Sequence, residues 1–179
     1  MGKRLALWLA LVIITVAFSS CGDGVDSLDM PKSTDLEFWV TQDVADVDFS
    51  EHEEIFGWFG AREYLGKGYK AVTNVDENPS YPVQYVSYLV TAYPDYADGG
   101  QFVTQITVKD PTVMVFGLTV NSSPEEIDSA MSEAGYDVVE KGSGVTGFVS
   151  DEGVAVTFDL VAKTITVGVS VSNREGIIF

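Results

Sequence analysis

Two neighbouring segments near the C-terminal end of the chain alternate strictly between apolar and polar residues, and this pattern constrains the fold most. The segments are "VAVTFDL" (154–160) and "TITVGVSV" (164–171). A period of two predicts β-strands that are apolar on one face only. The residues predicted to face the core are Val154, Val156, Phe158, Leu160, Ile165, Val167, Val169 and Val171. The chain should therefore contain an antiparallel sheet with one covered face and one open polar face.

The chain also carries the same kind of pattern twice. Residues 49–72 and 122–139 each run from a serine, through acidic residues, to a Gly-Tyr pair. Ser50 and Glu53 have the spacing of a capping box, and so do Ser123 and Glu126. We therefore predict one helix in each half, the first of them bent by two internal glycines and the second with an apolar stripe. His52 would be a solvated residue at the start of the first helix.

Strand-like segments flank both predicted helices. Residues 36–43 and 112–120 precede them, and residues 82–93 and 101–108 follow the first one and are rich in β-branched and aromatic residues. Each half therefore reads as β-α-β-β-β. The predicted fold class is α+β, a single domain at 36–179 made of two repeats, 36–110 and 112–173, with the helices packed on one face of an antiparallel sheet.

Tandem units of this kind in an exported chain resemble the β-lactamase-inhibitor-protein-like fold. The segment "FGLTVNSSPEEIDSAM" is similar in style to the helix starts of those proteins. The resemblance implies a protein that acts by binding a partner. The alternative is an α+β domain that is unrelated to this fold and whose repetition is coincidental.

The N-terminal segment gives an expected location. Lys3 and Arg4 precede the apolar run 5–18, which is the pattern of a secretory leader and is too short to span a membrane comfortably. The residues "FSSC" resemble the lipobox of bacterial lipoproteins, which implies that Cys21, the only cysteine, carries lipid. We expect a leader at 1–20, a flexible tether at 21–35, and a domain held at the extracytoplasmic side of a membrane. An ordinary signal peptide is the alternative.

Composition excludes some functions. The formal net charge of −17 makes nucleic acid an unfavourable partner. The sole histidine is His52 and the sole thiol is that of Cys21, so the sequence shows no Ser-His, Cys-His or multi-His constellation. We therefore expect no enzyme, cofactor or metal, although a catalytic pair of carboxylates stays possible. Acidic residues gather at 43–54 and 95–98, but neither segment has EF-hand spacing, and solvated loops explain them better than calcium.

Aromatic and acidic residues between positions 81 and 98 are the best candidates for a binding surface. Tyrosine offers a large contact area at small entropic cost, although such residues also fill cores. The candidate binding residues are Tyr85, Tyr93, Asp95, Tyr96 and Asp98. Two functions follow: a protein-interaction or inhibitor-like module with an envelope protein as partner, or a module that binds glycan or cell wall through exposed tyrosines.

Overall fold

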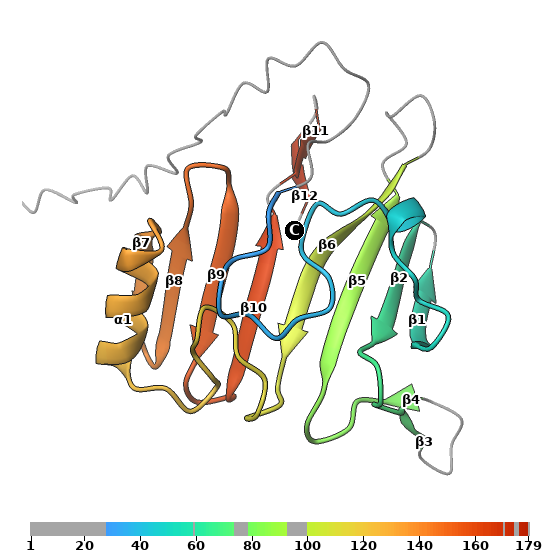
Figure 1. Cartoon of the computed structure of the whole chain (residues 1–179), viewed down its shortest axis with the longest axis horizontal. Coiled ribbons are helices and arrows are strands. Elements are labelled where there is room, and N and C mark those ends of the chain that lie inside the picture. Colours follow the sequence, from blue (N-terminus) through green and yellow to red (C-terminus); the bar gives the residue numbers. More distant parts are fainter. Residues whose placement is uncertain are drawn as a thin grey trace, which may run out of the picture.

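The described part of the chain is built around one broad antiparallel sheet, and one face of this sheet is covered (Figure 1). The computed structural model describes residues 28–58, 60–73, 79–92, 100–169, 171–173 and 176–178. Within these ranges lie an eight-stranded antiparallel sheet, two two-stranded pairs, one α-helix and one 3-10 turn (Figure 1). The elements are η1 (Val44–Asp46), β1 (Glu53–Trp58), β2 (Ala61–Leu65), β3 (Val72–Thr73), β4 (Pro79–Ser80), β5 (Val86–Ala92), β6 (Gln101–Val108), α1 (Pro124–Glu133), β7 (Asp137–Gly142), β8 (Val145–Val149), β9 (Val154–Asp159), β10 (Thr164–Val169), β11 (Val171–Asn173) and β12 (Gly176–Ile178).

The large sheet consists of two meanders of four strands. Its order is β1-β2-β5-β6-β10-β9-β8-β7, so the first meander meets the second where β6 pairs with β10. At this junction Ile106 lies opposite Val167 and Thr107 lies opposite Thr166. Each half places its last strand at the centre of the sheet, so the two meanders share one ladder of backbone hydrogen bonds.

One face of the sheet is covered by α1 and by long connecting segments. In Figure 1, α1 lies over the β7–β8 end, and residues 28–52 cross the middle of the same face. Ile127 and Met131 of α1 and Trp39 of the crossing segment are fully buried. They pack with apolar residues from the central strands, namely Val86, Tyr88, Val90, Val103, Ile106, Val108, Phe148, Val154, Val156, Phe158, Ile165 and Val167.

The strands predicted from alternation are confirmed. Residues 101–108 form β6, and the segments at 82–93, 154–160 and 164–171 contain β5, β9 and β10. Of the eight residues predicted to face the core, five are buried: Val154, Val156, Phe158, Ile165 and Val167. Leu160 and Val169 are partly buried against the core, and the side chain of residue 171 lies outside the described residues.

The predicted fold class, α+β with a helix in each half, is wrong. The segment expected to form the first helix is the β1–β2 hairpin, in which Trp58 pairs with Ala61 across a turn containing Gly60 at φ 77°. Glycine at two positions weakens a helix by about 1 kcal/mol each, whereas Ile, Phe and Trp favour strands. The expected capping box does not form either, because the Glu53 carboxylate accepts from the Ala71 N–H at 2.9 Å.

The predicted β-α-β-β-β order is wrong in both halves. Residues 36–43 make an isolated bridge, between Asp43 and Phe102 of β6, and the Thr41 N–H donates to the Val103 carbonyl at 2.8 Å. Residues 112–120 form a tight turn instead of a strand, because Phe116 and Gly117 both take positive φ. Apolar residues in these two segments pack down onto the sheet, which accounts for their strand-like composition.

The second predicted helix is confirmed as α1. The Ser123 hydroxyl accepts from the Glu126 N–H, the Glu126 carboxylate accepts from the Ser123 N–H, and Pro124 occupies the first turn. These contacts satisfy N–H groups that would otherwise lack partners at a helix start. The helix carries Ile127 and Met131 into the core.

The chain joins the domain by residue 28. The Leu28 N–H donates to the Thr41 hydroxyl at 2.9 Å, and Leu28 and Met30 pack against the core. The predicted leader (1–20) and Cys21 lie outside the described residues. No helix in the described part of the chain is both long enough and apolar enough to cross a membrane.

Candidate functional site

The sheet face opposite α1, called here the open face, carries the candidate site. Side chains of directly opposed residues in an antiparallel sheet point to the same side. Thr107 and Gln105 therefore lie on the face opposite Ile106 and Val108, which are buried under the covering segments. The same alternation places Ser87, Leu89 and Thr91 of β5 on the open face.

Exposed aromatic side chains lie at the β1 end of the open face. Phe56 pairs with Glu63 and Trp58 pairs with Ala61, and both partners lie opposite open-face residues of β5. The side chains of Phe56, Trp58 and Tyr81 are 48%, 75% and 46% exposed. A tryptophan exposed to this extent on an edge strand stabilises the fold little, and it is the residue type most often found at the centre of binding interfaces. We call Phe56, Trp58, Tyr81 and Tyr85 the aromatic end.

A hydrogen-bonded cluster fixes the tyrosines of the aromatic end. The rings of Tyr81 and Tyr85 stack with centroids 4.8 Å apart and planes 25° apart. The Tyr81 hydroxyl donates to Glu63 Oε2, and the Ser87 hydroxyl donates to Glu63 Oε1 at 2.8 Å. Burial, together with the hydrogen bond to Glu63, raises the pKa of Tyr81, and burial also raises the pKa of Tyr85. Both phenols therefore stay protonated at neutral pH.

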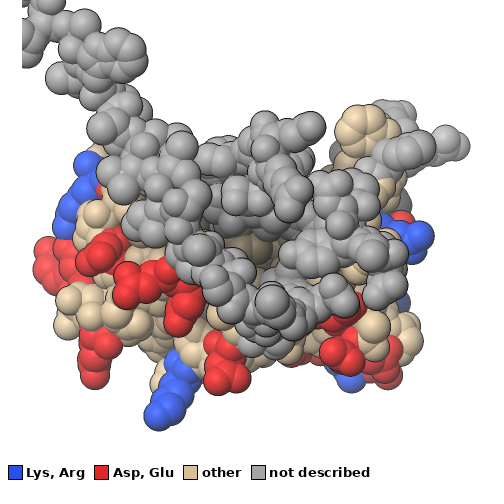
Figure 2. Space-filling model, turned by 90° about the horizontal axis from the view of Figure 1, so that it is seen from above, with Lys and Arg blue, Asp and Glu red and all other residues tan. Residues whose placement is uncertain are grey.

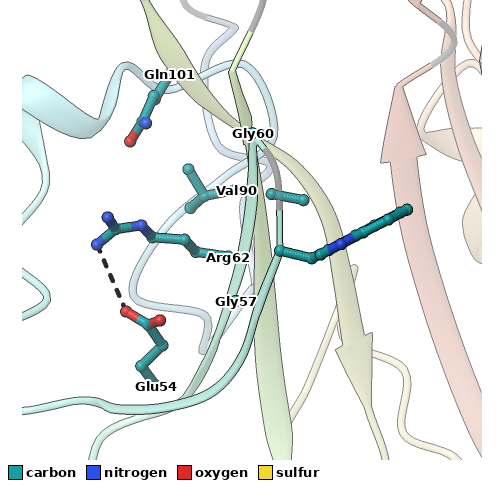
Figure 3. A pocket seen from close by; sticks show the side chains of 8 residues that line it. Glu54, Gly57, Gly60, Arg62, Val90 and Gln101 are labelled. Carbon is teal, nitrogen blue, oxygen red and sulfur yellow. Dashed lines mark ion pairs between the residues drawn. The ribbon is translucent and has the colours of Figure 1, made fainter.

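A cavity of about 350 Å³ lies at the same end of the sheet, lined by residues of β1, β2, β5 and β6. Figure 3 shows the Glu54 and Arg62 side chains pointing toward each other on one side of the hairpin, with a carboxylate–guanidinium distance of 3.5 Å. Arg62 lies opposite Val90, so this ion pair belongs to the covered side of the sheet. The Glu54–Arg62 pair therefore lies on the opposite side of the hairpin from Phe56 and Trp58.

One predicted site residue lies in this cluster. Tyr85 is half-buried on the open face and stacks on Tyr81. The predictions for Tyr93, Asp95, Tyr96 and Asp98 lie outside the described residues. Sequence reasoning missed Trp58, Phe56 and Glu63, because it placed residues 50–68 in a helix. Reading "EEIFGW" as a strand would have put both aromatic residues on one face.

The prediction that His52 is solvated is wrong. Its side chain is 2% exposed and lies on the covered face, with the rings of Phe38 and Phe49 each 5.2 Å away. His52 Nε2 is 3.4 Å from a Glu37 oxygen, yet neither ring nitrogen has a hydrogen-bond partner in the described structure. This histidine packs among aromatic rings and does not reach the open face.

Two of the acidic residues at 43–54, Asp43 and Asp48, accept hydrogen bonds within local turns. The Asp43 carboxylate accepts from the Ala45 N–H at 2.8 Å, and the Asp48 carboxylate accepts from the Ser50 N–H at 2.9 Å, which lowers the pKa of Asp48. Among the described residues, no group of three or more His, Cys, Asp or Glu side chains could hold a metal ion. Acidic side chains dominate the charge visible in Figure 2, in keeping with the net charge of −17.

Comparison of the chain with protein-family models, curated proteins and solved structures finds no match.

Proposed function

We propose that this chain is a lipid-anchored binding protein on the extracytoplasmic side of a membrane, and that a macromolecular ligand of the cell envelope contacts its open face at the aromatic end. The observation that carries the proposal is Trp58, 75% exposed on the same face of the sheet as Phe56. Burying a tryptophan side chain of this kind in an interface commonly contributes 2 kcal/mol or more.

The anchor would keep the domain close to its membrane. The lipobox-like "FSSC" supports lipid on Cys21, and residues 22–27 then lie between the lipidated residue and Leu28, the first described residue that contacts the domain. Six extended residues span at most about 20 Å. A ligand of this domain would therefore lie within a short distance of the membrane surface. An acidic surface also disfavours contact with anionic headgroups, which holds the domain off the lipid.

Binding without chemistry is the activity we propose. The open face offers aromatic rings, hydroxyls, an amide and the Glu63 carboxylate, which are groups that recognise a ligand through stacking and hydrogen bonds. A protein partner is one candidate, because an exposed tryptophan beside other exposed aromatic residues is typical of the centre of a protein interface. A glycan is the other, because a planar aromatic and a carboxylate stand together at Tyr81 and Glu63.

We expect the Cys21→Ser variant to lose its lipid and its membrane attachment. The cysteine sulfur is the atom that would carry the lipid through a thioether bond, which serine cannot form. Cells that express either form of the full chain are grown with a clickable fatty-acid probe, and the label on the protein is compared along with its partition between membrane and soluble fractions. Equal label on both forms would rule out lipidation at this cysteine.

We also expect a photo-crosslinking amino acid at position 58 to capture the ligand in living cells. The matched control is position 161, because Val161 is 78% exposed, close to the value for Trp58, and lies in the β9–β10 turn away from the aromatic end. Adducts should form at 58 and not at 161, and their mass and protease sensitivity report the ligand class. Equal capture at both positions, or none at 58, would contradict the proposed site.

A further inference from the structure

Two register rows cross the open face from strand to strand. One row links Ser87, Thr107, Thr166 and Thr157 on β5, β6, β10 and β9, and we call it the hydroxyl row. The row beside it runs from Phe56 across every strand of the large sheet to β7, through Glu63, Leu89, Gln105, Gly168, Ala155, Val149 and Asp137. Adjacent strands lie about 4.8 Å apart, so β1 to β9 spans about 24 Å.

In the middle of the sheet the two rows carry no charged side chain, and the hydroxyl row is polar. Between β5 and β8 neither row contains an acidic or basic residue, although the chain as a whole carries a net charge of −17. Gln105 is exposed, and Thr157 and Thr166 are half-buried. In the described part of the chain the hydroxyls of Thr157 and Thr166 make no hydrogen bond to protein. These groups can donate to and accept from a ligand without any charge to compensate.

Two residues of the second row, Gly168 and Ala155, have little or no side chain and leave room beside the threonine hydroxyls. A Cβ added to Gly168 would meet only the Thr104 carbonyl oxygen, at 3.7 Å, and Ala155 is the next residue in the row. Thr166 and Thr157 therefore stand beside a strip of short side chains. An extended ligand lying across the strands could reach the threonine hydroxyls and Gln105 from this strip.

At the β1 end the second row reaches exposed aromatic rings next to the Glu63 carboxylate. Phe56 and Trp58 expose their rings, and Glu63 accepts one hydrogen bond on each oxygen, from Tyr81 and from Ser87. Each oxygen keeps further capacity to accept. Aromatic faces stack on the apolar face of a sugar ring, and a carboxylate accepts from adjacent sugar hydroxyls.

We infer that the open face binds an uncharged polysaccharide that lies across the strands, with sugar rings stacked on Trp58 and Phe56 and hydroxyls bonded along Glu63, Gln105, Thr166 and Thr157. The inference rests on the proposed function and names the ligand class of the same site. Charge separates it from the alternatives: an anionic polymer would be repelled by the acidic chain, and a protein interface draws its specificity from complementary charges that the hydroxyl row does not offer.

The test is affinity electrophoresis of the intact chain, purified in detergent, in native gels that contain one polysaccharide each. The neutral probes are hydroxyethyl cellulose, soluble starch and galactomannan, and alginate is the anionic control. At least one neutral polymer should retard the chain, and alginate should not. Trp58→Ala should weaken the apparent affinity about 10-fold or more, and the Thr157→Val/Thr166→Val double variant about 3-fold to 10-fold. Val161→Ala, equally exposed in the wild type, should leave it unchanged, and circular dichroism checks the fold of each variant.

Retardation by none of the neutral polymers, equal retardation by alginate, or full retardation of Trp58→Ala would overturn the inference. The crosslinking experiment separates its failure from that of the proposed function. Protease-sensitive adducts at position 58 without retardation by any polysaccharide would leave a binding site with a protein ligand. Absence of adducts at position 58 would remove the site itself.

Discussion

Trp39→Ala is expected to lower the free energy of unfolding by about 3–5 kcal/mol, the cost of truncating a large aromatic side chain in a packed core. Trp39 is 1% exposed and lies in the segment that crosses the covered face, where its ring meets Phe116 edge-on with centroids 5.9 Å apart. The backbone N–H of Trp39 donates to the Gln42 side-chain oxygen at 2.7 Å. This bond holds the backbone in place and limits its collapse into the space left by the missing ring. Urea denaturation followed by circular dichroism measures the difference in the free energy of unfolding, with both proteins in a Cys21→Ser background to avoid a lipid anchor.

The matched control is Trp58→Ala. The same substitution at a side chain 75% exposed should change the free energy of unfolding by no more than about 0.5 kcal/mol. Typical domains are stable by only about 5–15 kcal/mol, so the contrast between the two tryptophans should be large. A loss below about 1 kcal/mol for Trp39→Ala would mean that residues 36–43 are not an essential cover of the sheet.

The parts of the fold that could be predicted are those decided by local sequence. Residues 154–171 alternate with a period of two and have turn residues between them, so only one assignment of faces buries the apolar set. Helix α1 was predictable because Ser123, Pro124 and Glu126 satisfy its first turn without help from the rest of the chain. Both predictions are correct because the residues within each segment are enough to specify its structure.

The first helix was mispredicted because local and non-local contacts compete there. Ser50 and Glu53 have capping spacing, yet the Ser50 N–H donates to Asp48, and Glu53 reaches across to Ala71. Strand β2 then pairs with β5, a contact between segments more than twenty residues apart. Pairing of this kind cannot be read from spacing within one segment, and it overrides a weak local preference.

The same misassignment hid the best part of the candidate site. The position of Tyr85 on the face opposite Tyr88 follows from the parity of one strand, and Tyr88 is indeed buried on the covered face. The grouping of Phe56, Trp58 and Glu63 with Tyr81 depends instead on the register of β1, β2 and β5. Register is decided by tertiary pairing, so only the structure brings these residues together.

Asp110→Ala is expected to lower the free energy of unfolding by about 3 kcal/mol at neutral pH, because hydrogen bonds to a charged group contribute about 1.5–3 kcal/mol and their partners would be left unpaired. Asp110 follows β6 and is 9% exposed. Its Oδ1 accepts from the Thr112 N–H at 2.7 Å and from the Thr112 hydroxyl at 2.6 Å, and its Oδ2 accepts from the Tyr69 hydroxyl at 2.7 Å. The carboxylate thus joins the loop after β2 to the loop after β6.

The Asp110→Asn variant tests the charge in that contribution through its pH dependence. The hydrogen bonds from Thr112, and then from Tyr69, lower the pKa of Asp110 below its ordinary value of 3.8. A carboxyl group whose pKa is lower in the folded state stabilises the fold fully above its ordinary pKa and loses that contribution as the pH falls through the folded value. The stability difference between wild type and Asp110→Asn should therefore be constant from pH 7 to about pH 5 and shrink below about pH 4. Other carboxylates titrate alike in both proteins and cancel, so a difference that stayed constant down to pH 2 would show that the ionised form of Asp110 contributes nothing beyond its shape.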